Sequence, residues 1–307
     1  MATQKMVITG VNGFVGKHLV RELKAHGIEV LGLDRATEAD SEIAHELSAY
    51  ISCDLSTSWP ETGEVDGVIH LAGLAAVGPS FEQPQLYLEV NSAIMTHLAE
   101  YYLTRGGRPR IIVVSSGAIY SPHQTMPLNE SAEIGYASPY AVSKVLVENQ
   151  CAYYRNRGLD CVVARPFNHL GPGQRPGFLL PDLYEQIKSC LQTGASLKVG
   201  NLQTKRDYTD VRDVVRAYRL LATTPKLKNA VYNICSGVSH AGSELLGELL
   251  KACQASSLST EVDSTKIRPN DPEDIVGDNT RLKQDTGWQP EIRLHQTIED
   301  FVKAHTS

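Results

Sequence analysis

The segment Met6-Val7-Ile8-Thr9-Gly10-Val11-Asn12-Gly13-Phe14-Val15-Gly16 decides the fold. It opens with a short apolar run, continues through three evenly spaced glycines, Gly10, Gly13 and Gly16, and leads into a helical pattern. An apolar run followed by a glycine-rich turn and a helix is the first half of a βαβ unit. We therefore expect a strand at 6–9 and a helix at 16–25.

The same rhythm continues through the first half of the chain. Further apolar runs alternate with helical stretches, at 28–33, 51–53, 67–71, 110–115 and 161–165. Most of these runs are continuously apolar rather than alternating, as in strands that helices cover on both faces. The sequence therefore predicts an α/β fold with a doubly wound parallel sheet.

The pattern changes after Arg165. The segment 166–182, PFNHLGPGQRPGFLLPD, is too rich in proline and glycine for another βαβ unit. A helix-like stretch at 211–221 and a strand-like stretch at 231–234 are placed to rejoin the sheet. We therefore expect 1–165 and 208–235 to form one domain. A smaller, discontinuous α/β domain would then comprise 166–207 and 236–307.

Composition excludes several classes of protein. The 307 residues are 42% hydrophobic and 21% charged, which is typical of globular proteins and not of disordered or fibrous ones. Lys and Arg total 29 against 35 Asp and Glu, a net charge of −6, so we expect no nucleic-acid partner. The six cysteines form no CxxC pair, and no signal peptide or membrane span is evident. We expect a cytoplasmic protein with no membrane association and no metal site.

The glycine turn and an acid after the second predicted strand indicate a dinucleotide site. Gly10, Gly13 and Gly16, with Phe14 between them, let the backbone approach a pyrophosphate at the N-terminus of a helix. Asp34 follows 18 residues after Gly16, where a carboxylate can bind ribose hydroxyls. The alternative is a glycine-rich turn that binds nothing.

The residues beside Asp34 leave the choice of cofactor open. A 2′-phosphate would meet the negative charge of Asp34, which favours NAD(H) over NADP(H). Arg35 can bind that phosphate, stack on adenine, or lie in solvent. Asp54 and Leu55, after the third predicted strand, are candidates to contact the adenine, although a solvated Asp at a strand end is the alternative.

The segment 138–144, SPYAVSK, carries the catalytic candidates. Ser138 is a good N-cap, so a helix begins here and places Tyr140 and Lys144 on one face. A neighbouring ammonium would lower the pKa of the tyrosine and suit it to proton transfer. Ser116 supplies a hydroxyl at the end of the fifth strand.

Two neighbouring residues have other expected roles. For Ser115, the preferred interpretation is a cap on the strand end. Asn91 is a candidate to organise the backbone or hold a water molecule.

Four motifs stand out: TGVNGFVG at 9–16, HLAG at 70–73, SSGAIY at 115–120 and YAVSK at 140–144. Together they resemble the extended short-chain dehydrogenase/reductase family, also called the NAD-dependent epimerase/dehydratase family. The resemblance implies a Rossmann domain with a smaller substrate domain, NAD(H) or NADP(H) as cofactor, and a homodimer. It also implies that Ser116, Tyr140 and Lys144 are catalytic and that Leu71 and Ala72 contact the cofactor.

The second half of the chain looks like the GDP-6-deoxy-4-keto-D-mannose reductases of that family, which form GDP-D-rhamnose. The matching stretches begin at Ala164, Lys198, Val231 and Ile267. This resemblance implies a GDP-sugar substrate that Asn168, Arg206 and Arg268 would contact, and paired guanidinium groups suit diphosphate oxygens.

The residue at 118 discriminates between reactions within the family. Sugar-nucleotide dehydratases of the family place an acid there, and epimerase-reductases of the fucose pathway place a cysteine, whereas this chain has Ala118. We therefore expect simple reduction at C4. The alternatives are a UDP-hexose 4-epimerase and a non-catalytic NAD(P)-sensing protein.

Overall fold

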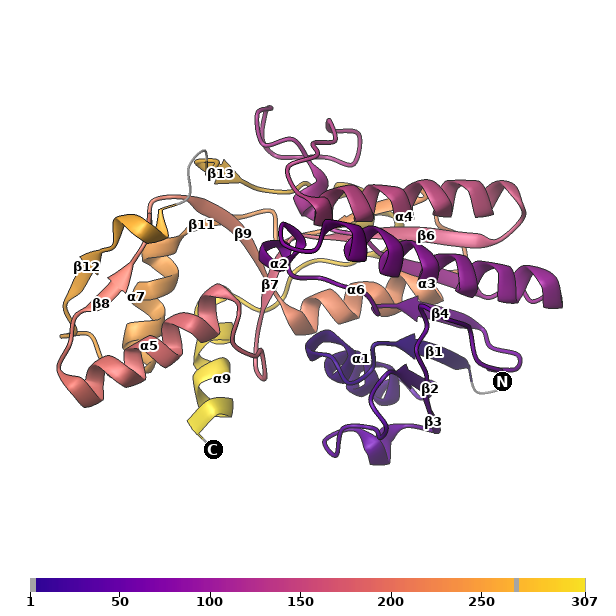
Figure 1. Ribbon diagram of the computed structural model, residues 1–307, viewed down its shortest axis with the longest axis horizontal. Helices are drawn as coiled ribbons and strands as arrows, with labels where there is room; N and C mark the ends of the chain where they lie inside the picture. The colour runs from indigo at the N-terminus through magenta and orange to yellow at the C-terminus, as the bar shows by residue number, and fades with distance from the viewer. Residues whose placement is uncertain (1–3, 268–270, 307) are drawn as a thin grey trace.

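The computed structural model describes residues 4–267 and 271–306. A seven-stranded parallel sheet forms the centre of its larger lobe (Figure 1). Its strands are β1 (Lys5–Thr9), β2 (Glu29–Asp34), β3 (Ala49–Ser52), β4 (Gly67–His70), β5 (Arg110–Val114), β6 (Asp160–Pro166) and β10 (Val231–Ile234). They lie in the order β10-β6-β5-β4-β1-β2-β3.

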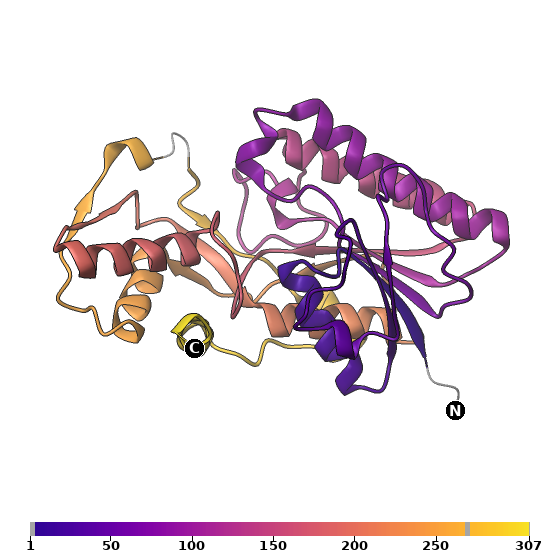
Figure 2. The ribbon, with the colours of Figure 1, turned by 60° about the horizontal axis from the view of Figure 1, so that its bottom comes forward.

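Helices cover both faces of this sheet (Figure 2). On one face lie α1 (Phe14–Ala25) and α6 (Val211–Thr223), and on the other α3 (Pro84–Arg105) and α4 (Pro139–Asn156). A short helix, α2 (Val77–Ser80), precedes α3. Along β1, Ile8 packs into the first core and Val7 into the second, and both are fully buried. Burial on both faces explains the continuous apolar runs, and the predicted doubly wound α/β fold is confirmed.

A smaller lobe lies beyond the carboxyl end of β6, on the left in Figure 1. Its sheets comprise β7 (Asn168–Leu170), β9 (Lys205–Asp210), β11 (Ser239–Ala241) and β13 (Asp274–Ile275), and a separate pair, β8 (Leu197–Val199) and β12 (Thr260–Val262). Its helices are α5 (Leu179–Thr193), α7 (Gly242–Ala252) and α9 (Leu294–Thr306). These helices and β8 share a separate apolar core.

The chain passes more than once between the two lobes. The strand predicted at 231–234 does rejoin the central sheet, because β10 pairs with β6 and sets Val231 opposite Val163. Later, Leu282 on α8 (Thr280–Thr286) and the fully buried Trp288 pack in the core beneath α1 and α6. The last part of the chain thus contributes to both cores, and the domain division given above stays a prediction.

Predicted and observed elements differ by one or two residues at their ends. The strands at 51–53, 67–71 and 110–115 each end one residue earlier, because the chain turns there into the loops of the carboxyl edge. Helix α1 begins two residues earlier, at Phe14. None of the described helices is long and apolar enough to cross a membrane.

Candidate active site

The glycine-rich turn after β1 fits a pyrophosphate. Gly10 has a φ of +69°, and a Cβ there would lie 3.0 Å from the backbone nitrogen of Ala72. A Cβ at Gly16 would lie 2.5 Å from the carbonyl oxygen of Gly10, so helix α1 can follow the turn this closely only without a side chain there. Gly13 is the N-cap of α1, and no side chain caps the helix. A bare helix N-terminus beside an open backbone turn is what a dinucleotide phosphate requires.

Asp34 ends β2 next to this turn. Its Oδ2 accepts a hydrogen bond from the N–H of Asn12 at 3.0 Å, and its Oδ1 accepts one from the N–H of Ala36 at 3.2 Å. These bonds fix the carboxylate at the sheet edge, where it suits ribose hydroxyls. Arg35 is exposed and acts electrostatically on Asp54.

Asp54 and Leu55 already make contacts within the protein. Oδ1 of Asp54 accepts bonds from the N–H and the hydroxyl of Ser56, at 2.9 and 2.6 Å. These bonds and, to a smaller extent, Arg35 lower the pKa of Asp54. The Leu55 side chain is buried in the core. Contact between either residue and an adenine stays a prediction.

A buried polar pair holds the Leu71-Ala72 segment in place. Thr9 and His70 lie opposite each other on β1 and β4, and Oγ1 of Thr9 lies 2.8 Å from Nδ1 of His70. The same hydroxyl oxygen accepts the N–H of Ala72 at 3.0 Å. Burial lowers the pKa of His70 to about 3, so the ring is neutral and can accept the threonine hydroxyl. Sequence reasoning missed Thr9 and His70 as a pair, because only the strand register sets them opposite each other.

The catalytic candidates lie at the start of α4. The helix begins at Pro139, and Oγ of Ser138 accepts the N–H of Ala141 at 3.1 Å, as the sequence predicts. Tyr140 and Lys144, one turn apart, are both buried, with exposed fractions of 6% and 8%. The N-cap thus fixes the turn that presents both side chains.

Burial governs the ionisation of Tyr140. It raises the pKa of the phenol, and a hydrogen bond with Ser116 opposes this with a smaller effect. The expected lowering by Lys144 is therefore wrong for this structure. The Lys144 ammonium lies 5.9 Å from the centre of the Tyr140 ring and donates to the carbonyl oxygen of Val114 at 2.9 Å. Tyr140 is thus a protonated phenol at neutral pH, suited to donating a proton.

Ser116 faces Tyr140 from the carboxyl end of β5. It caps a short turn, Gly117–Ile119, and its Oγ accepts the N–H of Ala118 at 3.1 Å. Its hydroxyl also forms a hydrogen bond with Tyr140, and this bond lowers the pKa of the phenol. The neighbouring Ser115 hydroxyl is buried and has no hydrogen-bond partner among the described residues, so it is not the capping group that we expected there.

Asn91 connects three segments of the site. Its Oδ1 accepts the N–H of Leu74 at 2.8 Å, and its Nδ2 donates to the carbonyl oxygen of Leu74 at 3.2 Å and to Oγ of Ser143 at 3.0 Å. Ser143 in turn donates to the carbonyl oxygen of Tyr140 at 2.8 Å. Asn91 thus organises the backbone around the catalytic helix, the first of the two roles expected for it.

The predicted substrate contacts lie on the smaller lobe. Asn168 is exposed at the start of β7 and pairs in register with Tyr208 of β9. Arg206, also on β9, forms an ion pair with Asp271 at 2.6 Å and donates to the carbonyl oxygen of Pro272 at 2.9 Å. Arg268 lies outside the described residues.

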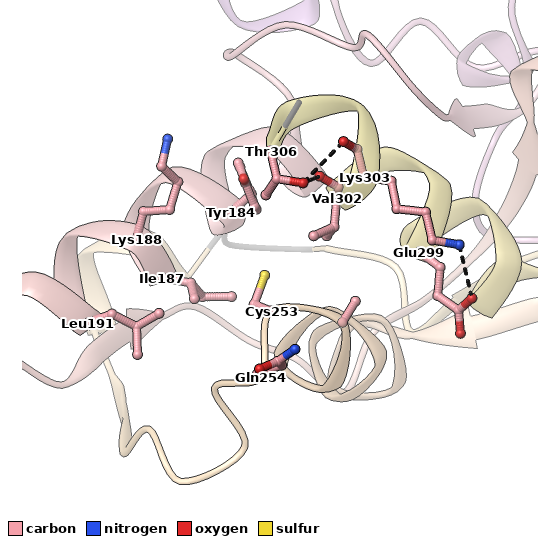
Figure 3. Close-up of a pocket in the computed structure, with 11 residues that line it drawn as sticks. Tyr184, Ile187, Lys188, Leu191, Cys253, Gln254, Glu299, Val302, Lys303 and Thr306 are labelled. Atoms are coloured by element: carbon pink, nitrogen blue, oxygen red, sulfur yellow. Dashed lines mark hydrogen bonds and ion pairs between the residues drawn. The ribbon is translucent and has the colours of Figure 1, made fainter.

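A surface groove on the smaller lobe lies apart from these residues (Figure 3). Helices α5, α7 and α9 form it, and none of the predicted site residues that the structure describes lines it. Its walls are mainly apolar, and Lys303 and Glu299 form an ion pair of 3.8 Å at its rim.

Comparison with known proteins agrees with the geometry. A family model described as "NAD dependent epimerase/dehydratase family" matches residues 6–235. The chain is 34% identical to the GDP-6-deoxy-D-mannose reductase of Pseudomonas aeruginosa, over 98% of this chain and 96% of that protein. It is 30% identical to a UDP-glucose 4-epimerase of Mycolicibacterium smegmatis, over 97% of each.

The fold agrees with a solved relative. The structure described as RMD from Pseudomonas aeruginosa complexed with NADPH superposes with a TM-score of 0.82, at 32% identity over 98% of each chain. The present chain is an NAD(P)-dependent oxidoreductase of nucleotide sugars and belongs to the NAD dependent epimerase/dehydratase family.

Proposed function

We propose that this enzyme reduces the 4-keto group of GDP-6-deoxy-4-keto-D-mannose to give a GDP-6-deoxyhexose, GDP-D-rhamnose. The observation that carries the proposal is the 34% identity, over 98% of the chain, to a protein named GDP-6-deoxy-D-mannose reductase. The group of Ser116, Tyr140 and Lys144 supports a carbonyl reduction with proton donation.

The chain's own residues supply the proton and the positioning. The reduced nicotinamide, when bound, supplies the hydride for C4. Tyr140 donates its phenolic proton to the carbonyl oxygen, and the raised pKa of the phenol keeps that proton in place at neutral pH. Ser116 donates a hydrogen bond to the same oxygen. Lys144 holds the cofactor ribose, while Gly10, Gly13 and Gly16 seat the pyrophosphate and Asp34 binds the adenosine ribose.

The substrate diphosphate would lie against the smaller lobe. Asn168 offers an exposed amide with no hydrogen bond to other described residues. Arg206 already forms an ion pair with Asp271 at 2.6 Å. A substrate diphosphate that binds Arg206 would therefore replace the Asp271 carboxylate as its partner. Arg268 is proposed as the second guanidinium.

A UDP-hexose 4-epimerase is the second candidate. The 30% identity to a UDP-glucose 4-epimerase, over 97% of the chain, supports it. An epimerase would use the same Ser116, Tyr140 and Lys144. It would retain its cofactor through a full cycle and consume no added NADH.

One set of assays separates the two functions. Purified enzyme is incubated with GDP-6-deoxy-4-keto-mannose and either NADH or NADPH, and the product sugar is identified by NMR. A parallel sample receives UDP-glucose without added cofactor. Stoichiometric oxidation of reduced cofactor with formation of a GDP-6-deoxyhexose supports the reductase. Interconversion of UDP-glucose and UDP-galactose, without reduction of the keto-sugar, would replace it with the epimerase.

We further propose a homodimer that pairs through α4. Val142, Leu146 and Tyr153 lie along one side of this helix and are 36%, 37% and 56% exposed. A row of exposed apolar side chains at helical spacing suits a two-fold helix contact. Sedimentation of the wild type should give a dimer that Leu146→Glu dissociates. The matched control Leu191→Glu, on the outside of α5 and 54% exposed, should leave the mass unchanged. A monomeric wild type would refute this proposal.

A further inference from the structure

His18 connects the helix of the glycine turn to the strand that begins with Asn168. It lies one turn into α1, and its Nε2 lies 2.8 Å from the carbonyl oxygen of Pro172, just beyond β7. A carbonyl oxygen can only accept, so Nε2 carries the hydrogen and donates. The bond joins segments 154 residues apart in the sequence.

An aromatic contact reinforces this connection. Phe14, the first residue of α1, packs edge-on against His18 with ring centres 5.5 Å apart. Phe14 also lies parallel to His169, with ring centres 6.4 Å apart and an angle of 4° between the rings. His169 directly follows Asn168 on β7. Helix α1 therefore contacts β7 through Phe14 and the segment just after β7 through His18.

The segment after β7 is also fixed from the other side. Gly171 lies so close to Val211 at the start of α6 that a Cβ would be 2.6 Å from its Cγ1. The amide of the buried Gln174 donates to the carbonyl oxygen of His169 at 3.2 Å. Between these contacts, the bond from His18 joins this segment directly to α1.

We propose that His18 is a positioning residue, which sets the strand bearing Asn168 at a fixed place relative to the glycine turn and thereby aligns the sugar nucleotide with the cofactor. This inference rests on the proposed function for the role of Asn168. The connection itself is independent of the substrate. Hydride transfer depends steeply on alignment, and a displacement of about 1 Å can cost about 100-fold in rate.

The imidazole acts through its hydrogen-bond donor. Burial lowers the pKa of His18, and the bond to Pro172 raises it by less, so the ring is neutral near pH 7. The charged groups that act on it are Arg21, Asp210 and Arg212. A glutamine has a donor at similar reach and no titration near neutral pH, so His18→Gln should retain the contact.

The experiment compares His18→Ala, His18→Gln and the control His26→Ala. His26 follows the same helix, is largely exposed and bonds to its own helix at the carbonyl oxygen of Glu22. We expect His18→Ala to lower kcat for the keto-sugar by about 10- to 100-fold. Its Kd for NADH should stay within about threefold. His18→Gln should recover most of kcat, and His26→Ala should match the wild type.

Hydrogen exchange tests the connection without the reaction. In His18→Ala, amides of 168–178 should exchange faster, while those of α6 and the Tm stay as in the wild type. A wild type that reduces no keto-sugar would refute the proposed function, and this exchange result would still decide the role of His18. The inference fails if 168–178 exchanges as in the wild type or if His18→Gln is no better than His18→Ala. It also fails if His18→Ala loosens the whole lobe, because His18 would then be a general packing residue.

Discussion

The ammonium of Lys144 donates a hydrogen bond to the carbonyl oxygen of Val114, 2.9 Å away, at the carboxyl end of β5. This bond joins Lys144, a candidate catalytic residue on α4, directly to the end of β5. Burial lowers the pKa of Lys144 to about 8, although Glu148, one turn further along α4, raises it by a smaller amount. The fold thus holds the Lys144 ammonium in a buried position that disfavours its charge, as is common at catalytic sites.

Lys144→Met should therefore abolish turnover and yet stabilise the protein at pH 7. The folded-state pKa of about 8 is below the ordinary 10.5, so folding with the charged lysine costs about 3 kcal/mol, at about 1.4 kcal/mol per unit. Between pH 8 and 10.5 the unfolded chain binds more protons at this lysine, so its contribution to stability rises with pH. The advantage of Lys144→Met should shrink across that window. Urea unfolding of Lys144→Met and the wild type at pH 7, 9 and 10 measures this difference in the free energy of unfolding.

The matched control is Lys188→Met on α5, whose side chain is 46% exposed. It should change the free energy of unfolding little at any of the three pH values. A difference between Lys144→Met and the wild type that does not vary with pH would show that the lysine titrates normally in the folded enzyme.

Tyr140→Phe should lower kcat by about 10²- to 10⁴-fold, the usual range for loss of a general acid. The ring still fills its buried site, so the Kd for NADH and the Tm should change little. Steady-state kinetics together with NADH fluorescence titration provide the measurement. Near-normal turnover would remove Tyr140 from the role of proton donor.

The local sequence predicted the elements that carry the candidate site. Continuous apolar runs gave the strands of the doubly wound sheet, and Ser138-Pro139 placed the start of α4 at the observed residue. Both signals act over a few neighbouring residues, through burial on two faces and through satisfaction of the first N–H groups of a helix. These two signals can therefore be recognised in the sequence without knowledge of the tertiary contacts.

What the sequence could not predict depends on long-range packing. Tyr140 and Lys144 were correctly placed on one face, but the direction of the tyrosine pKa was wrong, because burial outweighs its neighbours. Thr9 and His70 are paired by the strand register, across 61 residues. Trp288 lies in the core of the larger lobe, although elements of the smaller lobe precede and follow it in the sequence. No local pattern encodes such contacts.

Asp34→Ala should shift the cofactor preference toward NADPH. The carboxylate is held by the N–H groups of Asn12 and Ala36, at 3.0 and 3.2 Å, so it cannot swing away from a 2′-phosphate without breaking these bonds. We expect the wild type to use NADH at least as well as NADPH. The substitution should weaken the binding of NADH about tenfold or more, as expected for the loss of a charged hydrogen bond. Kd values for both cofactors measure the ratio.

Asp54→Ala is the control for that experiment, because it removes an exposed carboxylate from the next strand end and should leave the ratio nearly unchanged. A strong wild-type preference for NADPH would contradict the prediction and show that Arg35 outweighs Asp34.

The last prediction concerns Ala118, which lies exposed within the short turn that Ser116 caps. A dehydratase must remove the C5 proton and protonate a departing hydroxyl, and a methyl group can do neither. The nearest acid along the following loop that could replace it, Glu130, is already engaged. Its carboxylate accepts the N–H of Asn233 at 2.9 Å and pairs with Arg281 at 3.3 Å, with its side chain 2% exposed.

We therefore expect no 4-keto-6-deoxy product from GDP-mannose and NAD alone, but oxidation of NADH once a separate dehydratase has made that keto-sugar. Mass spectrometry of both reactions decides this. Keto-sugar formed without the dehydratase would mean that another acid reaches C5, and loss of that product in Glu133→Gln, but not in Glu130→Gln, would identify the exposed Glu133 as its source.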